Sequence, residues 1–498
     1  MALPGRATKW PEKVLFGRKS EKLDADQFEF ALEDIETAIA ETEAERDAGD
    51  ETPRPMEKKP RAANRGALPK HLPRIEEVIE PESMTCSCGG DLHMIGEDVS
   101  ERLDVIPAQF RVIVTRRPKY GCRGCEGGIS QAPAPEHIIQ SGLPTEALIA
   151  QVLVSKYADH TPLYRLAQIY SRQGIELDRS TLANWVGKAA FELKPVFECL
   201  LENLKTSTKL YMDETRAPVL DPGRGKTKTG YFWALARDDR PWDGNDPPGV
   251  AYCYAPGRSG TYAENILDGF SGILQVDGYA GYNRLTKSKR KGSPIELAYC
   301  WAHARRKLYD VAKNSTAPPL RHARACPAGQ RIAEEGLKRI AELYRIEADI
   351  KGQSAEARLN ARHQRSVPCI DAFELWLAKH RRGVSGKSPL GEALRYIARF
   401  WNGLTLFLSD GRIEMDNNAV ERTIRPIALN RKNALFAGHD TGAQNWGIIA
   451  SLIESAKLNK IEPHAYLTAT LKAIVAGHKQ SKIEQLLPWN YIAEINHV

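Results

Sequence analysis

Between residues 209 and 298, short strand-like runs alternate with turns, and their order constrains the fold more than any other feature of the chain. Residues 209–220, 230–237 and 249–254 are candidate strands, and residues 262–270 have helical spacing. Candidate strands at 272–276 and 295–298 follow, and a helix is expected to begin near Cys300. The sequence therefore predicts a mixed α/β sheet, with Asp213 in its first strand and Asp277 directly after its fourth.

Three strands, a helix and a strand, followed by more α/β alternation, is the order of a ribonuclease-H-like (retroviral integrase-like) core. In such a core the acids at the ends of the first and fourth strands lie side by side, so Asp213 and Asp277 are expected to meet. A chain of 498 residues has room for roughly three or four domains. We therefore expect a multidomain α+β protein, with this catalytic core at residues 205–315 and its final helix at 410–435.

A third acid stands in the stretch MDNNAVERTIRP at residues 415–426. Asn417, Glu421 and Arg425 recur every four residues and so share one face of a helix, which we expect to stop at Pro426. Two interpretations remain open from this segment alone. Either Glu421 belongs to a metal-bound phosphate site, or Asn418 and Glu421 form a capping box and Arg425 merely pairs with Glu421.

Taken together, Asp213, Asp277 and Glu421 indicate a metal site for phosphoryl transfer. Converging carboxylates repel one another unless cations neutralise them, and Mg²⁺ or Mn²⁺ suits such oxygen ligands. Two such ions can activate a water or a 3′-hydroxyl and stabilise the leaving oxygen of a phosphodiester. Asp213 would bridge both ions, Asp277 would hold one, and Glu421 would hold the other.

Basic side chains near these acids are candidates for DNA contacts. Arg422 and Arg425 are expected to hold DNA phosphates or to steady the acid itself. His303 and Arg306 follow the fifth strand and are candidates for contact with the scissile region, although a capped helix with a satisfied histidine explains them equally well.

Long helical patterns surround the core. Residues 316–409 carry apolar stripes at helical spacing, including Ala333, Leu337, Ile340 and Tyr344, and are interpreted as a helical insertion that splits the α/β domain. Residues 436–498 are expected to form a C-terminal helical segment.

Two tight cysteine pairs within residues 76–140 predict a zinc-binding module. Cys86 and Cys88 form the first pair and Cys122 and Cys125 the second, with a strand-like stretch at 110–114 between them. Two thiolate pairs brought together by a hairpin supply the tetrahedral sulfur ligands that zinc favours. The alternative is four ordinary thiols, with His93 or His137 as substitute ligands, and the first pair is C-x-C where C-x-x-C is usual.

Residues 141–204 are helical throughout and predict a helix-turn-helix. Pro144 and Pro162 open two helices, Gly174 closes the second, and a third helix is expected to begin after Asp178 or Ser180. The exposed start of the third helix would present residue types that reach bases or phosphates in a major groove. These candidate DNA-binding residues are Arg179, Asn184 and Lys188.

The N-terminal part has two segments of opposite charge. Residues 1–51 form an acidic segment with helical spacing, and residues 52–75 form a basic, proline-rich arm for DNA, or alternatively a solvated linker. No stretch approaches the roughly 18 continuous apolar residues of a membrane helix, and the start lacks the pattern of a secretory signal. A cytoplasmic protein without a membrane partner is expected, which agrees with nine cysteines used partly in pairs.

The motifs together resemble the insertion sequence 66 family of bacterial DDE transposases. The resemblance covers almost the whole chain and rests on the stretches VLFGRKSEKLD, IGEDVSERLD, RPKYGCRGC, SKYADHTPLYR, DRSTLANWV, YMDET, QVDGYAGYN, CWAHARRK and DNNAVERTIRP. It implies a zinc-binding module, a helix-turn-helix, a ribonuclease-H-like core with a helical insertion, and Mg²⁺-dependent transposition. The catalytic acids of the family fall on Asp213, Asp277 and Glu421, and members are thought to act with small accessory proteins of the same element.

We therefore expect a DNA transposase that binds the terminal inverted repeats of its element, hydrolyses phosphodiester bonds there and joins the ends to target DNA, acting as a homo-oligomer on DNA. One alternative is a non-catalytic DNA-binding protein, either a regulator or a decayed transposase, that uses only the zinc module and the helix-turn-helix. Another is a ribonuclease-H-like nuclease without strand transfer.

Overall fold

The computed structural model describes residues 109–120, 130–140, 142–221, 226–287, 294–314 and 328–492. The chain divides into two compact units, Asp50–Pro135 and the remainder, and each is considered by itself. The segments predicted at 1–51 and 52–75 lie outside the described residues, as do the four cysteines of the predicted zinc module.

The described part of the smaller unit contains one short hairpin. Its strands β1 (Lys119–Tyr120) and β2 (Ser130–Gln131) pair antiparallel. The strand predicted around Phe110, Val112 and Val114 is wrong, because these residues belong to no strand and Val112 is 86% exposed. A β-branched run forms a strand only where a neighbouring strand completes its hydrogen bonds, and the described residues of this unit supply none beside it.

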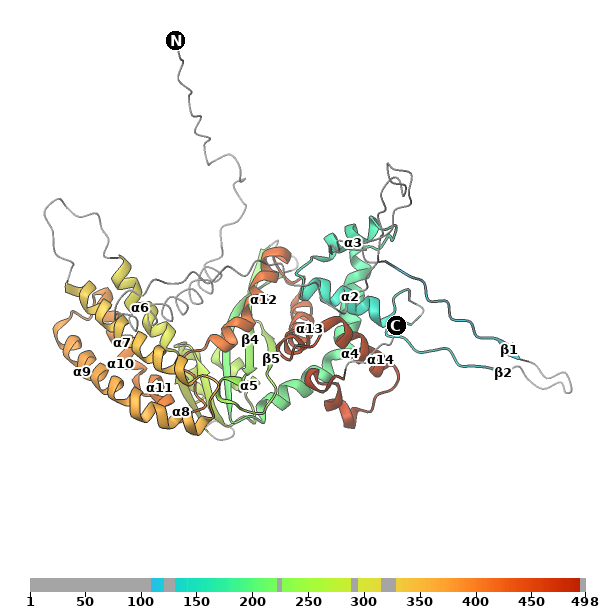
Figure 1. The fold of residues 1–498 in the computed structure, drawn as a ribbon. Helices are drawn as coiled ribbons and strands as arrows, with labels where there is room; N and C mark the ends of the chain where they lie inside the picture. The colour runs from blue at the N-terminus through green and yellow to red at the C-terminus, as the bar shows by residue number, and fades with distance from the viewer. Residues whose placement is uncertain are drawn as a thin grey trace, which may run out of the picture. The chain divides into compact units, whose positions relative to one another are not determined.

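A five-stranded sheet lies at the centre of the larger unit (Figure 1). Its strands are β3 (Lys209–Asp221), β4 (Lys226–Arg237), β5 (Gly249–Ala255), β6 (Gly272–Val276) and β7 (Ile295–Tyr299), in the spatial order β5-β4-β3-β6-β7. β3, β4 and β5 pair antiparallel, and β6 and β7 run parallel to β3. All five predicted strands form, and α5 (Gly260–Ile266) separates the third from the fourth as expected.

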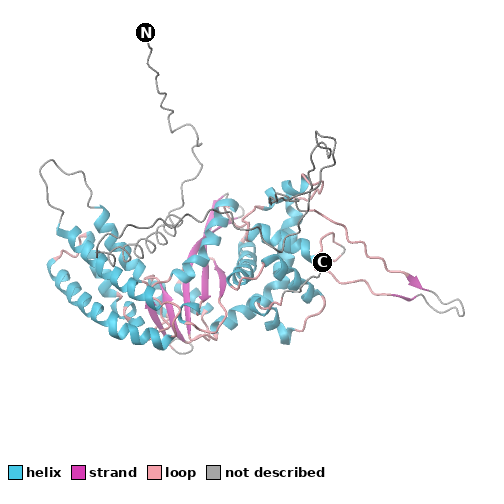
Figure 2. Cartoon of the chain, viewed as in Figure 1, coloured by secondary structure: helices cyan, strands magenta, loops and turns pink. Residues whose placement is uncertain are grey.

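Helices cover the sheet, as Figure 2 shows. Every residue of β4 from Phe232 to Arg237 is buried, which requires cover on both faces. The edge strand β5 is covered by α13 (Asp440–Leu458), whose Ser451 and Ser455 hydroxyls accept from the backbone N–H groups of Tyr252 (2.8 Å) and Val250 (3.0 Å). The C-terminal segment, which also includes α14 (Pro463–Val475), is therefore part of the core packing.

Three helices precede the sheet in the order that the sequence predicts. They are α2 (Glu146–Tyr157), α3 (Leu163–Ser171) and α4 (Arg179–Lys205). Thr145 caps α2 by accepting from the N–H of Leu148, and Gly174 has the positive φ of +78° that the turn after α3 requires.

A block of helices follows the sheet. It comprises α6 (Trp301–Asn314), α7 (Ala328–Ile350), α8 (Ala355–Ala361), α9 (Val367–Gly383), α10 (Pro389–Arg399) and α11 (Trp401–Leu404). The predicted apolar stripes face its core, where Ile340 and Leu394 are fully buried. Ser388 caps α10, which begins at the expected proline. No helix in the described ranges is both long and apolar enough to span a bilayer.

The helix α12 (Asn418–Ala434) runs through Pro426, so the predicted stop at this residue is wrong. Proline lacks the N–H that would bind the carbonyl of Arg422. However, Ile424 and Ile427 on either side are buried against the sheet, and we attribute the continuation of the helix to this packing.

Arg362 joins the helical block to the chain that leads back to the sheet. Its side chain is fully buried, and its Nε and Nη2 donate to Oε1 (2.8 Å) and Oε2 (2.6 Å) of Glu347 on α7. It also donates to the carbonyls of Phe407, Asp410 and Ile413. Arg358 adds a bond to Glu347 (3.2 Å) and another to the Glu414 carboxylate (2.6 Å).

We expect Glu347→Ala to lower the free energy of unfolding by about 3–5 kcal/mol, because two buried arginines lose their shared carboxylate. The matched control is Glu342→Ala on the same helix, which removes the partner of Arg345 from a half-exposed pair and should cost less than about 1 kcal/mol. Chemical denaturation followed by circular dichroism measures both values. Equal losses in the two variants would contradict the role given to the buried pair.

Candidate active site

Asp213 and Asp277 lie at the same level of neighbouring parallel strands. The register of β3 and β6 pairs Tyr211 with Gln275, and two further residues along each chain lead to Asp213 and Asp277. Strands in a sheet lie about 4.8 Å apart, and residues at equal levels of a parallel pair project from the same face. Continued by two residues, the register therefore brings these two half-buried aspartates side by side.

The side chain of Gln275 binds the segment that returns from the helical block. Gln275 is 1% exposed, and its Nε2 donates to the carbonyls of Glu414 (2.9 Å) and Asp416 (3.1 Å). Its Oε1 accepts from the N–H of Glu414 (2.9 Å). The N–H of Trp301 donates to the carbonyl of Met415 (2.8 Å). These bonds fix the chain directly before α12.

The start of α12 differs from the predicted capping box. Its N-cap is Asn417, whose side chain makes no capping bond and instead donates from Nδ2 to the carbonyl of Met212 on β3 (3.4 Å). Asn418 is the first helical residue, and it donates from its backbone N (3.1 Å) and its Nδ2 (3.0 Å) to the Asp416 carboxylate. The capping-box interpretation is therefore wrong, because Asp416 accepts the hydrogen bonds at this helix end.

Glu421 lies in the first turn of α12 and is buried, at 6% exposure. Asn417 on the same face is also buried, whereas Arg425 one turn further along is exposed, as is Arg422. On the helix face predicted to carry Asn417, Glu421 and Arg425, the first two side chains are therefore buried and the third is exposed. The carboxylate faces the protein and the two arginines reach the surface, where a phosphate backbone is accessible to them.

Glu421 also lies beside two residues that follow β7. Among the described residues, the potential metal ligands whose atoms all lie within 4.8 Å of one another are Cys300, His303 and Glu421, and this group does not include Asp213 or Asp277. The register of β6 and β7, continued by one residue, puts Cys300 level with Asp277. Asp213, Asp277 and Cys300 therefore form a row across three strands, with Glu421 at the Cys300 end.

Negatively charged side chains lie close to this row. Burial raises the pKa of the Cys300 thiol well above its usual range, and the Glu421 and Asp416 carboxylates raise it further. Burial raises the pKa of Asp416 to about 6, with a further contribution from Glu414. Crowded carboxylates of this kind favour a bound cation.

Sequence reasoning missed Glu214, whose only signal is that it follows Asp213 directly. Strand alternation directs it to the opposite face of the sheet. Its buried carboxylate accepts from Arg258 Nε (2.6 Å) and from the hydroxyl of Tyr282 (2.6 Å). Burial and the Asp277 carboxylate raise the pKa of Glu214 to about 7, against the opposing effects of Arg258 and Tyr282.

Arg258 and Tyr279 connect Glu214 to the loop that carries Asp277. The Arg258 guanidinium lies 4.1 Å from the centre of the Tyr279 ring, and the Tyr279 hydroxyl donates to the carbonyl of Arg258. The backbone N–H of Tyr279 donates to Oδ1 of Asp277 (2.9 Å). The loop after β6 is thus anchored to β3 by contacts on the far face of the sheet.

The predicted DNA-binding residues lie on three helices. Arg179, Asn184 and Lys188 are exposed on α4, and His303 and Arg306 are half-buried on α6. Asn184 and Lys188 line a surface pocket of about 710 Å³.

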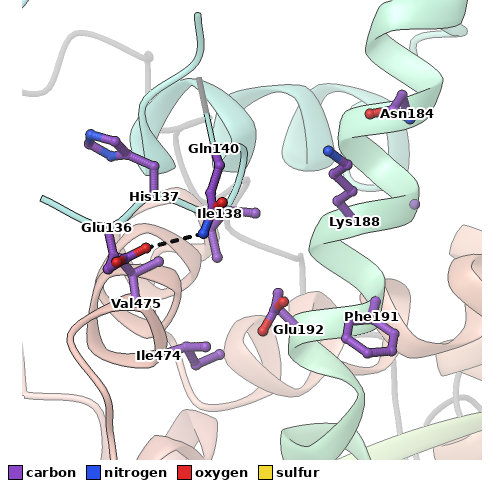
Figure 3. Close-up of a pocket in the computed structure, with 11 residues that line it drawn as sticks. Glu136, His137, Ile138, Gln140, Asn184, Lys188, Phe191, Glu192, Ile474 and Val475 are labelled. Carbon is purple, nitrogen blue, oxygen red and sulfur yellow. Dashed lines mark hydrogen bonds between the residues drawn. The ribbon is translucent and has the colours of Figure 1, made fainter. Parts of the chain in front are cut away.

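Figure 3 shows Lys188 and Glu192 projecting from α4 into this pocket, toward the segment that contains Glu136 and Gln140. Two glutamates make the pocket unfavourable for a phosphate. The exposed start of α4 is therefore the better candidate for a DNA contact.

We expect Arg258→Ala to lower the free energy of unfolding by about 2 kcal/mol, because Glu214 stays buried without its cationic partner. This is less than for a fully buried pair, since the Arg258 side chain is 45% exposed. Arg284→Ala is the control, because Arg284 pairs with Glu264 nearer the surface and should cost less than about 1 kcal/mol. Thermal denaturation of both variants tests this, and an unchanged melting temperature for Arg258→Ala would contradict it.

Comparison with protein families gives four matches. Residues 141–445 match the family described as Transposase IS66 family, and residues 451–489 match the IS66 C-terminal element. Residues 83–126, which include all four paired cysteines, match the zinc-finger binding domain of transposase IS66. This match supports a structural zinc. Residues 9–76, which span most of the two predicted N-terminal segments, match the description Transposase C of IS166 homeodomain.

Curated relatives agree over nearly the whole chain. The uncharacterized protein y4jD of Sinorhizobium fredii is 44% identical over 97% of this chain and 93% of its own length. The uncharacterized proteins y4qI and y4hP of the same organism are 44% and 38% identical, each over 96% of this chain and 87% of their own lengths. Because the transposase match alone spans more than half of the sequence, this chain belongs to the IS66 family of transposases.

Proposed function

We propose that this protein is the DNA transposase of a bacterial insertion sequence and that Asp213, Asp277 and Glu421 are its catalytic acids. The proposal rests on the register between β3 and β6. When this register is continued by two residues, Asp213 and Asp277 lie on one face of neighbouring parallel strands. The spatial order of three antiparallel strands followed by two parallel ones supports a ribonuclease-H-like core. The return of the chain at Gln275 brings Glu421 to the same end of the sheet.

The donor set fits Mg²⁺ or Mn²⁺ at the two aspartates. Their carboxylates are half-buried, and carboxylate oxygens are the ligands these hard cations prefer. Asp213 and Asp277 would hold the ions, with Glu421 as a further ligand. When bound, such ions lower the pKa of an attacking water or hydroxyl and neutralise charge on the phosphodiester.

The chain's own groups would position the DNA. Arg422 and Arg425 are exposed directly beside the buried Glu421, so they would hold phosphates on either side of the cleaved bond. Arg179 and Asn184 on α4 would contact the terminal inverted repeats of the element. The proposed reaction has two steps, which are hydrolysis at the element end and attack of the resulting 3′-hydroxyl on target DNA. These steps need the DNA contacts of α12 and those of α4 together.

A homo-oligomer and small accessory proteins of the same element are further partners that we propose.

We expect Asp277→Ala to retain DNA binding and to lose Mg²⁺-dependent strand cleavage, because the sheet would lose one of its paired carboxylates. Labelled element ends, a target plasmid and Mg²⁺ give nicked and joined products that gels resolve. The control is Asp268→Ala, an exposed acid on the same domain. Unchanged cleavage by Asp277→Ala would refute the catalytic assignment. Nicked but unjoined products from the wild type would indicate a nuclease, and binding without cleavage would indicate a DNA-binding regulator.

We expect Arg179→Ala to weaken binding to element ends and to reduce the slope of log affinity against log salt by about 0.9, the value for one lost phosphate contact. Lys194→Ala is the control, because Lys194 lies further along α4 and pairs with Glu198. Fluorescence anisotropy at several salt concentrations measures both slopes. Identical slopes for Arg179→Ala and the wild type would remove Arg179 from the phosphate contacts.

A further inference from the structure

We propose that Cys300, His303 and Glu421 form a separate site for a thiophilic divalent cation of the zinc class. The site is distinct from the cysteine pairs of the zinc-finger match and from the paired aspartates. Only its consequence for catalysis rests on the function proposed above.

The ligand atoms of the three residues all lie within 4.8 Å of one another. Cys300 directly follows β7, and His303 lies three residues further on, in the first turn of α6. Glu421 enters from the first turn of α12. A strand end and two helix starts therefore direct a sulfur, a nitrogen and an oxygen donor to one point.

Backbone contacts hold these elements together without a metal. The N–H of Asn417 donates to Sγ of Cys300 (3.3 Å), and the N–H of Trp301 donates to the carbonyl of Met415 (2.8 Å). The indole of Trp301 is fully buried and donates to the carbonyl of Leu404 (2.7 Å). These contacts hold the three ligands near one point.

The donor set selects the class of cation. Thiolate and imidazole are ligands for Zn²⁺ and related transition metals, whereas Mg²⁺ prefers oxygen. A thiolate and a carboxylate together carry the charge that a divalent cation neutralises, which matters because Cys300 and Glu421 are 2% and 6% exposed. Three protein ligands leave a fourth tetrahedral position open for water.

Glu421 would then be shared between two ion positions. A zinc-class ion bound with Cys300 and His303 would withdraw this carboxylate from the Mg²⁺ held near Asp213 and Asp277. The availability of thiophilic metal would thus oppose strand cleavage through a residue that both sites need.

The test is a Co²⁺ titration of the full-length protein in the absence of DNA, with one equivalent of zinc per chain for the four paired cysteines and all further zinc removed, so that the Cys300 site is free to bind Co²⁺. Co²⁺ bound to a thiolate gives a charge-transfer absorption band and visible bands of tetrahedral intensity. We expect the wild type to bind about one Co²⁺ per chain with these bands. Cys300→Ser should lose the charge-transfer band, and His303→Ala should lower the affinity. The control Cys369→Ser removes a half-buried thiol of the helical block and should keep the spectrum unchanged.

Two results would overturn the proposal. One is a wild-type spectrum that Cys300→Ser leaves intact, and the other is His303→Ala with wild-type Co²⁺ affinity. Circular dichroism establishes that each variant is folded, and His303→Ala decides the matter where Cys300→Ser does not fold. Asp277→Ala should keep the Co²⁺ bands, so a failure of this site and a failure of the catalytic assignment give different results.

Discussion

The hydrogen bonds of Gln275 are the interaction on which the arrangement of the candidate active site depends. This amide on β6 binds the backbone of Glu414, which stands 139 residues later in the sequence. The side-chain amide of Gln275 thus makes the hydrogen bonds to the Glu414 N–H and carbonyl that the backbone of a neighbouring strand would otherwise make. A buried amide satisfied on both its oxygen and its nitrogen has few alternative partners, so the return point is specific. The first turn of α12, and with it Glu421, follows from that point.

The helical block supports this return from its other end. Arg362 is fully buried and gathers the carbonyls of residues 407, 410 and 413, while Arg358 holds the Glu414 carboxylate. Both arginines bind Glu347, so all of their hydrogen bonds form only when α7, α8 and the chain at residues 407–414 are in place. A buried charge without its partner is costly. The helical block, which has a hydrophobic cluster of its own, therefore also acts as a structural brace for the chain that leads to the candidate site.

The elements predicted well from the sequence are those fixed by local patterns. The five strands, the three helices before them and the apolar stripes of the block depend on spacing and on turn residues that single segments reveal. Apart from the capping box, where the nearby Asp416 proves to be the acceptor, the errors concern interactions between distant segments. Pro426 does not end α12, because burial of Ile424 and Ile427 against the sheet maintains the helix. No sequence pattern marked Cys300 or Glu214 as part of the site, because the residues beside them there come from elements far along the chain.

The distance along the sequence between the parts of the site has a consequence for synthesis. Asn417 reaches back 205 residues to the carbonyl of Met212, and α13, which covers β5, is made later still. A chain emerging from a ribosome carries Asp213 and Asp277 long before Glu421 can join them. A truncated product that ends within the helical block would have two of the three proposed acids and an uncovered edge strand. The proposed site would thus be completed only at the end of translation, and an interrupted message would yield a protein that lacks it.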